Sequence, residues 1–396
     1  MSARPTARPV GHKPPFWRDR AKRALIFQVL VVAAVAAFLL YIVGNTQQNL
    51  AARGITTGFG FLDNTAGFGI VQSLIDYSSQ STYGRTFFVG LLNTLLVGGL
   101  GVLAATIIGF IVGIARLSPN WLIAKLAAAY IEIFRNIPLL LQIFFWYFAV
   151  LRTLPSARES YAFGEIIFLN VRGLYLPDPL FESGFGLIPV AFIVALIASI
   201  ALIVWNKRRH EATGKRLPAY WTAFGLLLGL PLLVLVATGV PITWDVPELR
   251  GFNFRGGVTV IPEFLALWLA LSIYTASFIA EIVRSGVQAI SHGQTEAAQA
   301  LSLPRNLILR LVVIPQAMRV IIPPLTSQYL NLIKNSSLAT AIGYPDLVSV
   351  FAGTTLNQTG QAIEVIAMTM AVYLSISLTV SLFMNWFNAR VALVER

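Results

Sequence analysis

The chain has 396 residues, of which 56% are hydrophobic and only 12% are charged. In a soluble domain about a quarter of the residues are charged, so the low charged fraction of this chain indicates that lipid is its main solvent. The formal net charge of +12 falls between apolar runs, so we attribute it to membrane topology and expect no nucleic-acid partner. With no cysteine and three scattered histidines, we expect no metal site and no cofactor.

Eight apolar stretches approach or reach the roughly 20 residues that a helix needs to cross a bilayer. They are residues 24–44, 87–115, 122–150, 185–205, 219–239, 261–283, 311–333 and 362–387. The seventh is the weakest, because Pro315, Pro323 and Pro324 would break it in water, although neighbouring helices can accommodate prolines inside a bundle. The sequence predicts an all-α membrane protein with about eight transmembrane helices.

The distribution of basic residues predicts the orientation of these helices. Lysines and arginines dominate the tail 1–23 and the loop after the fourth span, whereas acids outnumber them in residues 45–83 and 153–184. By the positive-inside rule both termini are expected in the cytoplasm. The first span, 24–44, is too long for a signal-peptide core and lacks a cleavage site, so it is interpreted as a retained anchor.

Catalytic motifs are missing from the sequence. The Gly214–Lys215 pair lacks the upstream glycine of a P-loop, so ATP binding through such a loop is not expected on this chain. We find no Ser/His/Asp set, H-E-x-x-H motif or pair of catalytic carboxylates. The chain is therefore not expected to be an enzyme, and no catalytic residue is assigned.

The loop between the sixth and seventh spans predicts a short helix outside the membrane. Thr295 is a suitable N-cap, residues 296–301 favour a helix, and Pro304 is expected to end it. Glu296 would lie at the N-terminus of this helix, where the helix dipole favours an acid. Such a helix could contact a soluble partner or could be a plain surface linker.

The same loop resembles the EAA signature of ABC importer permeases, which reads E-A-A, three residues, Gly, nine residues and I-x-L-P. Here Glu296, Ala297 and Ala298 are followed by Ser302 at the glycine position and by Ile314–Pro315. In that family the loop docks into a cleft of a separate ATP-binding subunit. The resemblance implies that these four residues, with Glu296 at the centre, form the docking loop.

Three further stretches resemble the amino-acid uptake branch of that family: residues 130–142 (E-x-x-R-x-x-P-L-L-x-Q), 279–288 (A-E-I-x-R) and 334–338 (K-x-[ST]-S-L). The similarity covers 87–387, with 152–260 as an inserted segment that carries two extra spans. The implied fold is the five-helix core of a type I importer plus three extra spans. This combination is similar to the larger permease of the general L-amino-acid uptake systems.

The resemblance implies a function in import. The chain would be a permease subunit of a bacterial inner-membrane ABC importer for L-amino acids that works by alternating access. Its implied partners are an ATP-binding subunit, a second permease subunit (a different chain is favoured) and a periplasmic amino-acid-binding protein, besides membrane lipid. The alternatives are a self-sufficient, ion-coupled secondary transporter with Glu132 or Glu364 as its ion site, and a structural anchor.

Charged and polar residues inside the spans are candidates for the substrate path, because they usually face the bundle interior or a water-filled cavity. Glu132 and Arg135 could bind the ammonium and carboxylate of an amino acid, or could neutralise each other. For Glu281 and Arg284, near the basic side, neutralisation within the pair is favoured. The other path candidates are Gln142, Lys334, Ser336 and Ser337.

Overall fold

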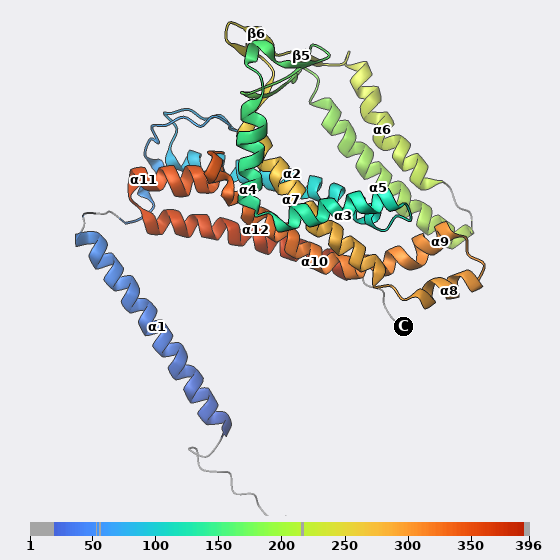
Figure 1. Cartoon of the computed structure of the whole chain (residues 1–396), viewed down its shortest axis with the longest axis horizontal. Helices are drawn as coiled ribbons and strands as arrows, with labels where there is room; N and C mark the ends of the chain where they lie inside the picture. Colours follow the sequence, from blue (N-terminus) through green and yellow to red (C-terminus); the bar gives the residue numbers. More distant parts are fainter. Residues whose placement is uncertain (1–19, 53, 55–56, 215–217, 392–396) are drawn as a thin grey trace, which may run out of the picture.

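The structure is a computed structural model that describes residues 20–52, 54, 57–214 and 218–391. Seven of its helices are long and apolar enough to cross a membrane, or eight if a bent pair counts as one span. The predicted helical membrane fold is therefore confirmed. The first span, α1 (Arg20–Ala52), stands apart from the other helices, and none of its most apolar window is buried (Figure 1).

The core forms where α2 (Tyr83–Arg116) packs along α7 (Pro262–Gln288). Two glycines of α2 allow this close contact. A Cβ added at Gly109 would lie 2.6 Å from the Cβ of Ile279, and one added at Gly113 would lie 2.7 Å from the carbonyl oxygen of Ala280. The Gly109/Gly113 pair is therefore a helix–helix interface rather than ordinary glycine in a membrane helix.

The third predicted span is broken rather than straight. It consists of α3 (Trp121–Asn136) and α4 (Leu139–Phe144), followed by η2 (Phe145–Val150) and η3 (Leu151–Thr153), with a bend of 105° at the break. Pro138 has no N–H to donate and holds Ile137 in an extended conformation. A single continuous helix over 122–150 was thus a wrong prediction.

The side chain of Gln142 braces this bend. Its Nε2 donates to the carbonyl oxygens of Phe134 (3.0 Å) and Ile137 (2.9 Å), which both lie at the break. Gln142 is only 4% exposed, so its side-chain amide is buried at the bend. The bend is therefore a built feature of the chain, held by a side-chain amide.

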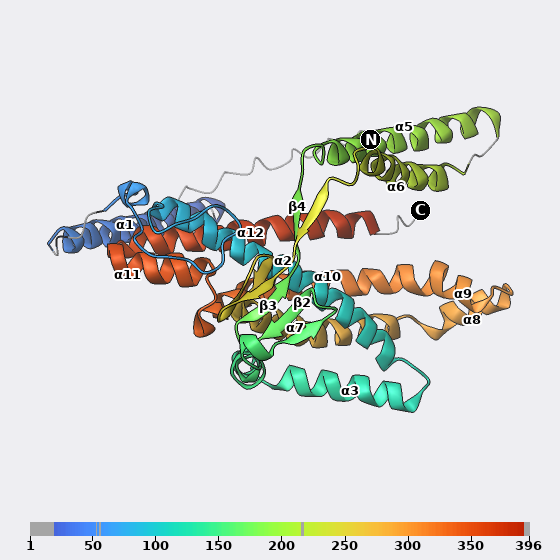
Figure 2. The same cartoon turned by 90° about the horizontal axis from the view of Figure 1, so that it is seen from above.

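Residues 152–260, which the sequence analysis predicts to be an inserted segment, form two spans and a layer of short strands. Helices α5 (Leu187–Thr213) and α6 (Ala219–Ala237) lie side by side as an antiparallel pair (Figures 1 and 2). The chain before α5 and the chain after α6 meet in one antiparallel sheet of order β1-β2-β3-β8. Two two-stranded sheets, β4-β5 and β6-β7, accompany it.

The strands of this layer are three or four residues long: β1 (Tyr161–Phe163), β2 (Ile167–Asn170), β3 (Gly173–Leu176), β4 (Asp178–Phe181), β5 (Ile242–Asp245), β6 (Glu248–Arg250), β7 (Asn253–Arg255) and β8 (Val258–Val260). The single turn η4 (Ala157–Glu159) precedes them. Tyr175 and Phe254 form a small core with Ala157. Sequence analysis did not predict this layer, because strands so short carry almost no alternating pattern.

The remaining elements lie at the two ends of the bundle. At one end are η1 (Gly60–Asp63), η6 (Ser336–Ile342), η7 (Val348–Thr355) and α11 (Leu356–Thr359). At the other end, α8 (His292–Ala300) and α9 (Arg305–Ile308) lead through η5 (Leu309–Val313) into α10 (Ile314–Asn335) (Figure 1). Despite its prolines, the stretch Arg305–Ile342 forms one span, and α10 packs against α7 and α12 (Ala362–Val391).

Candidate functional site

The first candidate site is α8, at the end of the bundle opposite α11 (Figure 1). Glu296 and Ala297 are exposed on it, whereas Ala298 is 4% exposed and packs in a small apolar cluster with Ile308 and Val313. The helix begins at His292, four residues before the predicted start at residue 296, so Thr295 is not its N-cap. The short helix is confirmed, and its acid is free to meet a partner.

Ser302 makes the turn after α8 in the conformation that usually requires glycine. Its φ is +57°, in the left-handed region that costs a residue with a Cβ roughly 1–2 kcal/mol. The turn is held because Ser302 N donates to Gln299 O (2.8 Å) and Leu303 N donates to Ala298 O (3.3 Å). The helix thus ends at Ala300, before Pro304 can act on it, and the prediction that Pro304 ends it was wrong.

The second candidate site is one face of α10. Ser327, Asn331 and Lys334 are exposed at intervals of four and three residues, although they lie within a membrane span. The opposite face, with Ile321 and Leu325, is buried. When a single subunit exposes polar side chains on the surface of a membrane span, this indicates that they face a water-filled path or a protein partner.

Lys334 and Ser337 line the same cavity of about 550 Å³, and their role in the substrate path stays a prediction. Ser336 is buried, and its hydroxyl donates to the carbonyl oxygen of Ile333 (2.7 Å). The other residues around the cavity come from η7 and α12: Val348, Thr369, Met370, Tyr373, Leu374 and Ser377. Tyr373 was missed, because one tyrosine in an apolar span gives no local signal.

Asp346, also missed by sequence analysis, is a fully buried acid in the connection between η6 and η7. Its Oδ1 accepts a hydrogen bond from Ser349 N (2.8 Å), and its Oδ2 accepts one from the Tyr373 hydroxyl (3.4 Å). Burial raises the pKa of the Asp346 carboxyl to about 7. Through its hydrogen bond with Tyr373, Asp346 therefore links the connection between η6 and η7 to the wall of the cavity.

Buried hydrogen bonds also fix this connection to α2. The Tyr344 hydroxyl donates to Asn93 O (3.0 Å), and Asn93 Nδ2 donates to Pro345 O (2.9 Å). Leu347 N donates to the hydroxyl of Thr94 (3.0 Å). Because all of these groups are shielded from water, the connection is expected to be rigid.

Glu132 and Arg135 do not neutralise each other within the described part of the chain. Both are exposed, and Asn136 Nδ2 donates to the backbone oxygen of Glu132 (2.7 Å). The Arg135 guanidinium lies over the ring of Phe278 on α7, 5.2 Å from its centroid. Their role in the path stays a prediction.

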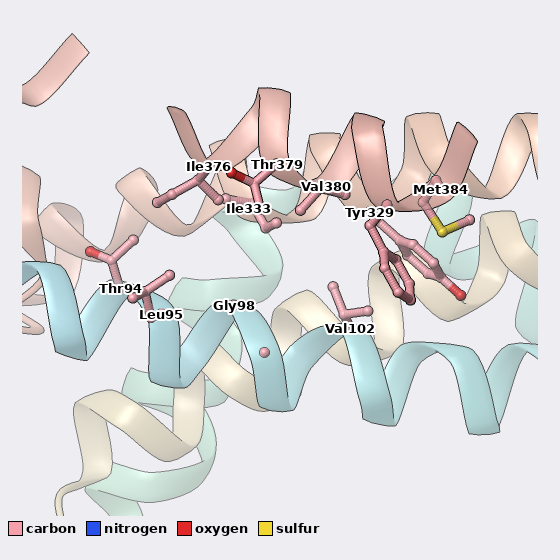
Figure 3. A pocket seen from close by; sticks show the side chains of 12 residues that line it. Thr94, Leu95, Gly98, Val102, Tyr329, Ile333, Ile376, Thr379, Val380 and Met384 are labelled. Atoms are coloured by element: carbon pink, nitrogen blue, oxygen red, sulfur yellow. The ribbon is translucent and has the colours of Figure 1, made fainter. Parts of the chain in front are cut away.

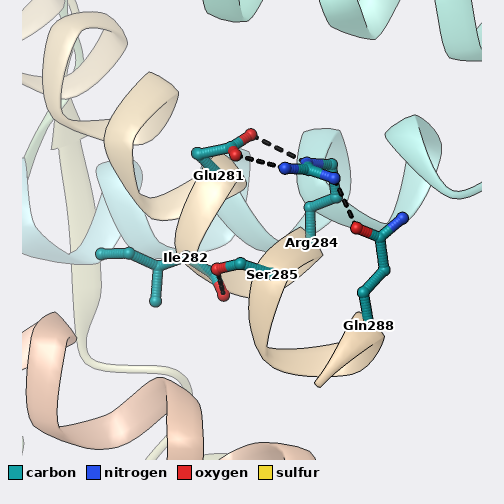
Figure 4. Close-up of polar contacts among 5 residues, drawn as sticks. All are labelled: Glu281, Ile282, Arg284, Ser285 and Gln288. Carbon is teal, nitrogen blue, oxygen red and sulfur yellow. Dashed lines mark hydrogen bonds and ion pairs between the residues drawn. The ribbon is translucent and has the colours of Figure 1, made fainter. Parts of the chain in front are cut away.

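Glu281 and Arg284 do form the expected neutral pair (Figure 4). Arg284 Nε donates to Oε2 of Glu281 (2.9 Å), and its Nη2 donates to the other carboxylate oxygen, so the contact is bidentate. Gln288 accepts a further hydrogen bond from Arg284 one turn along the helix. The charges of Glu281 and Arg284 thus compensate each other.

An apolar cavity of about 450 Å³ lies between α2, α10 and α12 (Figure 3). Thr94, Gly98 and Val102 line it from α2, while Tyr329 lines it from α10 and Met384 from α12. The Tyr329 hydroxyl bonds to that of Thr106, so its ring faces the cavity without an unpaired polar group. This space suits hydrocarbon rather than a charged solute.

Glu364, the second ion-site candidate of the secondary-transporter alternative, lies in the first turn of α12. Its Oε1 accepts a hydrogen bond from Gly58 N (2.7 Å). The carboxylate thus tethers the segment that precedes α2 to the start of the last span. We find no second charged group bonded to it among the residues that the structure describes.

Comparison with known proteins identifies the family. Residues 216–393 match the family described as binding-protein-dependent transport system inner membrane component. The chain is 59% identical to a putative amino-acid ABC transporter permease protein, YhdX, of Escherichia coli K12, over 94% of its own length and 95% of that protein. It is 55% identical to the general L-amino acid transport system permease protein AapQ of Rhizobium johnstonii (96% and 94%).

A third relative is the glutamate/glutamine/aspartate/asparagine transport system permease protein BztB of Rhodobacter capsulatus, which is 41% identical over 96% of both chains. These similarities span nearly the whole chain, the extra helices included. The resemblance noted from the EAA loop is confirmed, and the ion-coupled alternative gains no support. The chain therefore belongs to the inner-membrane permease subunits of binding-protein-dependent ABC importers, which work with ATP-binding and substrate-binding partners and are not themselves enzymes.

Proposed function

We propose that this permease imports L-amino acids and that the exposed polar face of α10 lines their path. The observation that carries the proposal is the row Ser327, Asn331 and Lys334, which faces outward from a membrane span. Lipid cannot solvate such a row, so a water-filled path between two permease subunits is its natural environment. The names of the relatives YhdX, AapQ and BztB support an amino acid as the cargo.

Lys334 is the proposed contact for the substrate carboxylate. It is exposed on a cavity that also offers the side chains of Ser337, Thr369 and Tyr373, so an ammonium ion and several hydroxyls share one space. The ammonium suits a carboxylate, because charge-assisted hydrogen bonds are the strong ones. Gln142 and Ser336 are proposed to act indirectly, since both side chains bond to backbone carbonyls.

The docking loop on α8 is proposed to transmit ATP-driven movement. Glu296 and Ala297 are open to a partner, while Ala298 anchors α8 to the start of the span that carries Lys334. A push on α8 would therefore reach α10 through packed side chains. The adjoining cavity of about 530 Å³, lined by Gln299 and Arg305 among others, offers room for a side chain of the ATP-binding subunit.

The proposed orientation follows the basic residues. Both termini and α8 face the cytoplasm, and the strand layer and η1 face the periplasm, where an amino-acid-binding protein would dock. A second permease subunit, with a different sequence, would complete the path. The single cysteine variants Asn64→Cys and Thr213→Cys test this, because only the first should react with an impermeant thiol reagent on intact cells.

Replacement of Lys334 tests the substrate contact. In Lys334→Met, loss of one charged hydrogen bond should weaken uptake of radiolabelled L-glutamine about ten- to hundredfold. Lys125→Met is the matched control, because Lys125 is an exposed lysine of α3 outside the cavity. Normal uptake by Lys334→Met, at equal protein level, would contradict the proposed contact.

A further inference from the structure

Arg319 is a cation inside a span whose charge the described chain does not balance. It lies in the first half of α10, within the span Arg305–Ile342. Its Nε and Nη2 are both covered and lack a hydrogen-bond partner. Among the residues that the structure describes, neither ion pair includes it.

Such an arrangement is costly unless a partner arrives from elsewhere. A guanidinium cannot give up its proton under cellular conditions, so it stays charged wherever it lies. An ionised side chain without a counter-group is unfavourable within a membrane span. Arg319 is half-buried, and a carboxylate from outside the described residues would supply its missing counter-charge.

Helical geometry relates Arg319 to the proposed path. Lys334 follows it by 15 residues, which is about 22 Å along α10 and a rotation of about 60° around the axis. The exposed polar residues Ser327 and Asn331 lie between the two cations. The helix carries no Asp or Glu, so this side of α10 offers two positive charges and no acid of its own.

We propose that Arg319 binds the carboxylate of the transported amino acid in the half of the path nearest α8, as a second binding site after Lys334. The inference rests on the proposed import of amino acids and adds a binding site to it. A guanidinium offers two parallel donors to a carboxylate, which an ammonium cannot do. Lys334 and Arg319 lie at opposite ends of the polar row, so the carboxylate would bind first to one and then to the other.

The test uses the assembled transporter with Arg319→Gln and Arg319→Lys. Both variants should assemble with their partner subunits. Uptake of radiolabelled L-glutamine should fall about ten- to hundredfold in Arg319→Gln and recover in part in Arg319→Lys, which keeps the charge without the planar fork. Unchanged uptake in Arg319→Gln would overturn the proposal. So would failure of both variants to assemble, because the missing anion would then belong to a partner subunit.

A labelling experiment separates substrate from a structural counter-ion. The native chain has no cysteine, so Arg319→Cys carries a single thiol. A small anionic thiol reagent should modify it in inverted vesicles, and L-glutamine supplied during turnover should slow that reaction. Thr213→Cys, exposed at the end of α5, should react at one rate with or without the amino acid.

One acid of this chain provides the decisive control. Glu395 follows α12 and lies outside the described residues. If Glu395→Gln reproduces the loss in Arg319→Gln, or if L-glutamine leaves labelling of Arg319→Cys unchanged, the guanidinium has a structural partner and the proposal fails. Uptake by the unaltered transporter tests the import function separately, so the two failures can be distinguished.

Discussion

Helix α10 and the α5–α6 pair are all membrane spans, but they differ in the polarity of their exposed side chains. The exposed side chains of α5 and α6 include Ile197 and Leu228. Among the described helices, α5 and α6 make extensive contacts only with each other. Helix α10 packs against α7, buries apolar residues such as Ile321 and Leu325, and exposes Asn331 and Lys334. An apolar exposed face is satisfied by lipid, whereas a polar one requires water or protein.

This difference separates a region whose exposed surface lipid can solvate from one whose exposed polar side chains need water or protein. The inserted pair can be solvated by lipid alone, so its outward surface needs no partner. The outward surface of α10, together with α8 and its exposed Glu296, is incomplete in the single chain. Substitutions should therefore have very different effects in the two regions.

The largest expected effect is at the α2–α7 contact. Gly109→Val would force a side chain into Ile279, since even an added Cβ would lie 2.6 Å from it, and little folded protein should accumulate. Gly225→Val in α6 is the control, because nothing lies within 4 Å of its added Cβ. Quantifying both proteins in membranes checks this. Equal amounts would show that the contact is not essential.

Loss of coupling is expected next. Glu296→Ala should abolish ATP-dependent uptake and leave the amount of inserted protein unchanged, because an exposed side chain adds little to folding. Glu248→Ala, an exposed acid of the strand layer, should transport normally. Uptake assays with both variants decide the matter. Normal uptake by Glu296→Ala would remove the docking role.

Exchanging the two kinds of exposed face tests the comparison itself. Asn331→Leu should lose uptake at normal protein level, since it interrupts the polar row of the path. Leu228→Asn, which places an amide in lipid, should instead lower the amount of inserted protein. The measurements are uptake and membrane protein level for each variant. The opposite outcome would mean that α10 faces lipid.

A smaller effect should appear in the pH dependence of stability. Burial raises the pKa of Asp346 from 3.8 to about 7, so folding favours the protonated carboxyl. Its contribution is complete below about pH 4 and is lost as pH rises through about 7. Thermal unfolding of the purified complex should therefore show a stability loss over this range that Asp346→Asn reduces. An unchanged pH profile in this variant would refute the assignment.

The smallest effect is expected at Ser302. Ser302→Gly should relieve the left-handed conformation at φ +57°, although the extra freedom of glycine in the unfolded chain offsets part of the gain. We expect the complex to be more stable by at most about 1 kcal/mol, with normal uptake. Thermal unfolding beside the unaltered protein measures it. A loss of stability would show that the serine side chain supports the turn.

The sequence by itself determined the features that depend on composition and short spacing. Apolar length located the spans, although not the break in the third, and the E-A-A spacing located α8, because both are properties of consecutive residues. Pro138 has no N–H, so the sequence also indicates that the carbonyl of Phe134 lacks its usual helical donor. That Gln142 would supply the donor, and that the chain would turn by 105°, depended on side chains meeting across the break.

Only the tertiary structure decided which polar residues come together. Asp346 and Tyr373 are 27 positions apart and meet because η7 and α12 pack side by side. Likewise, Arg135 lies on Phe278 of another helix rather than on Glu132, three positions away. A charge is paired by its neighbours in space, and the sequence alone does not specify those neighbours when they lie on different helices.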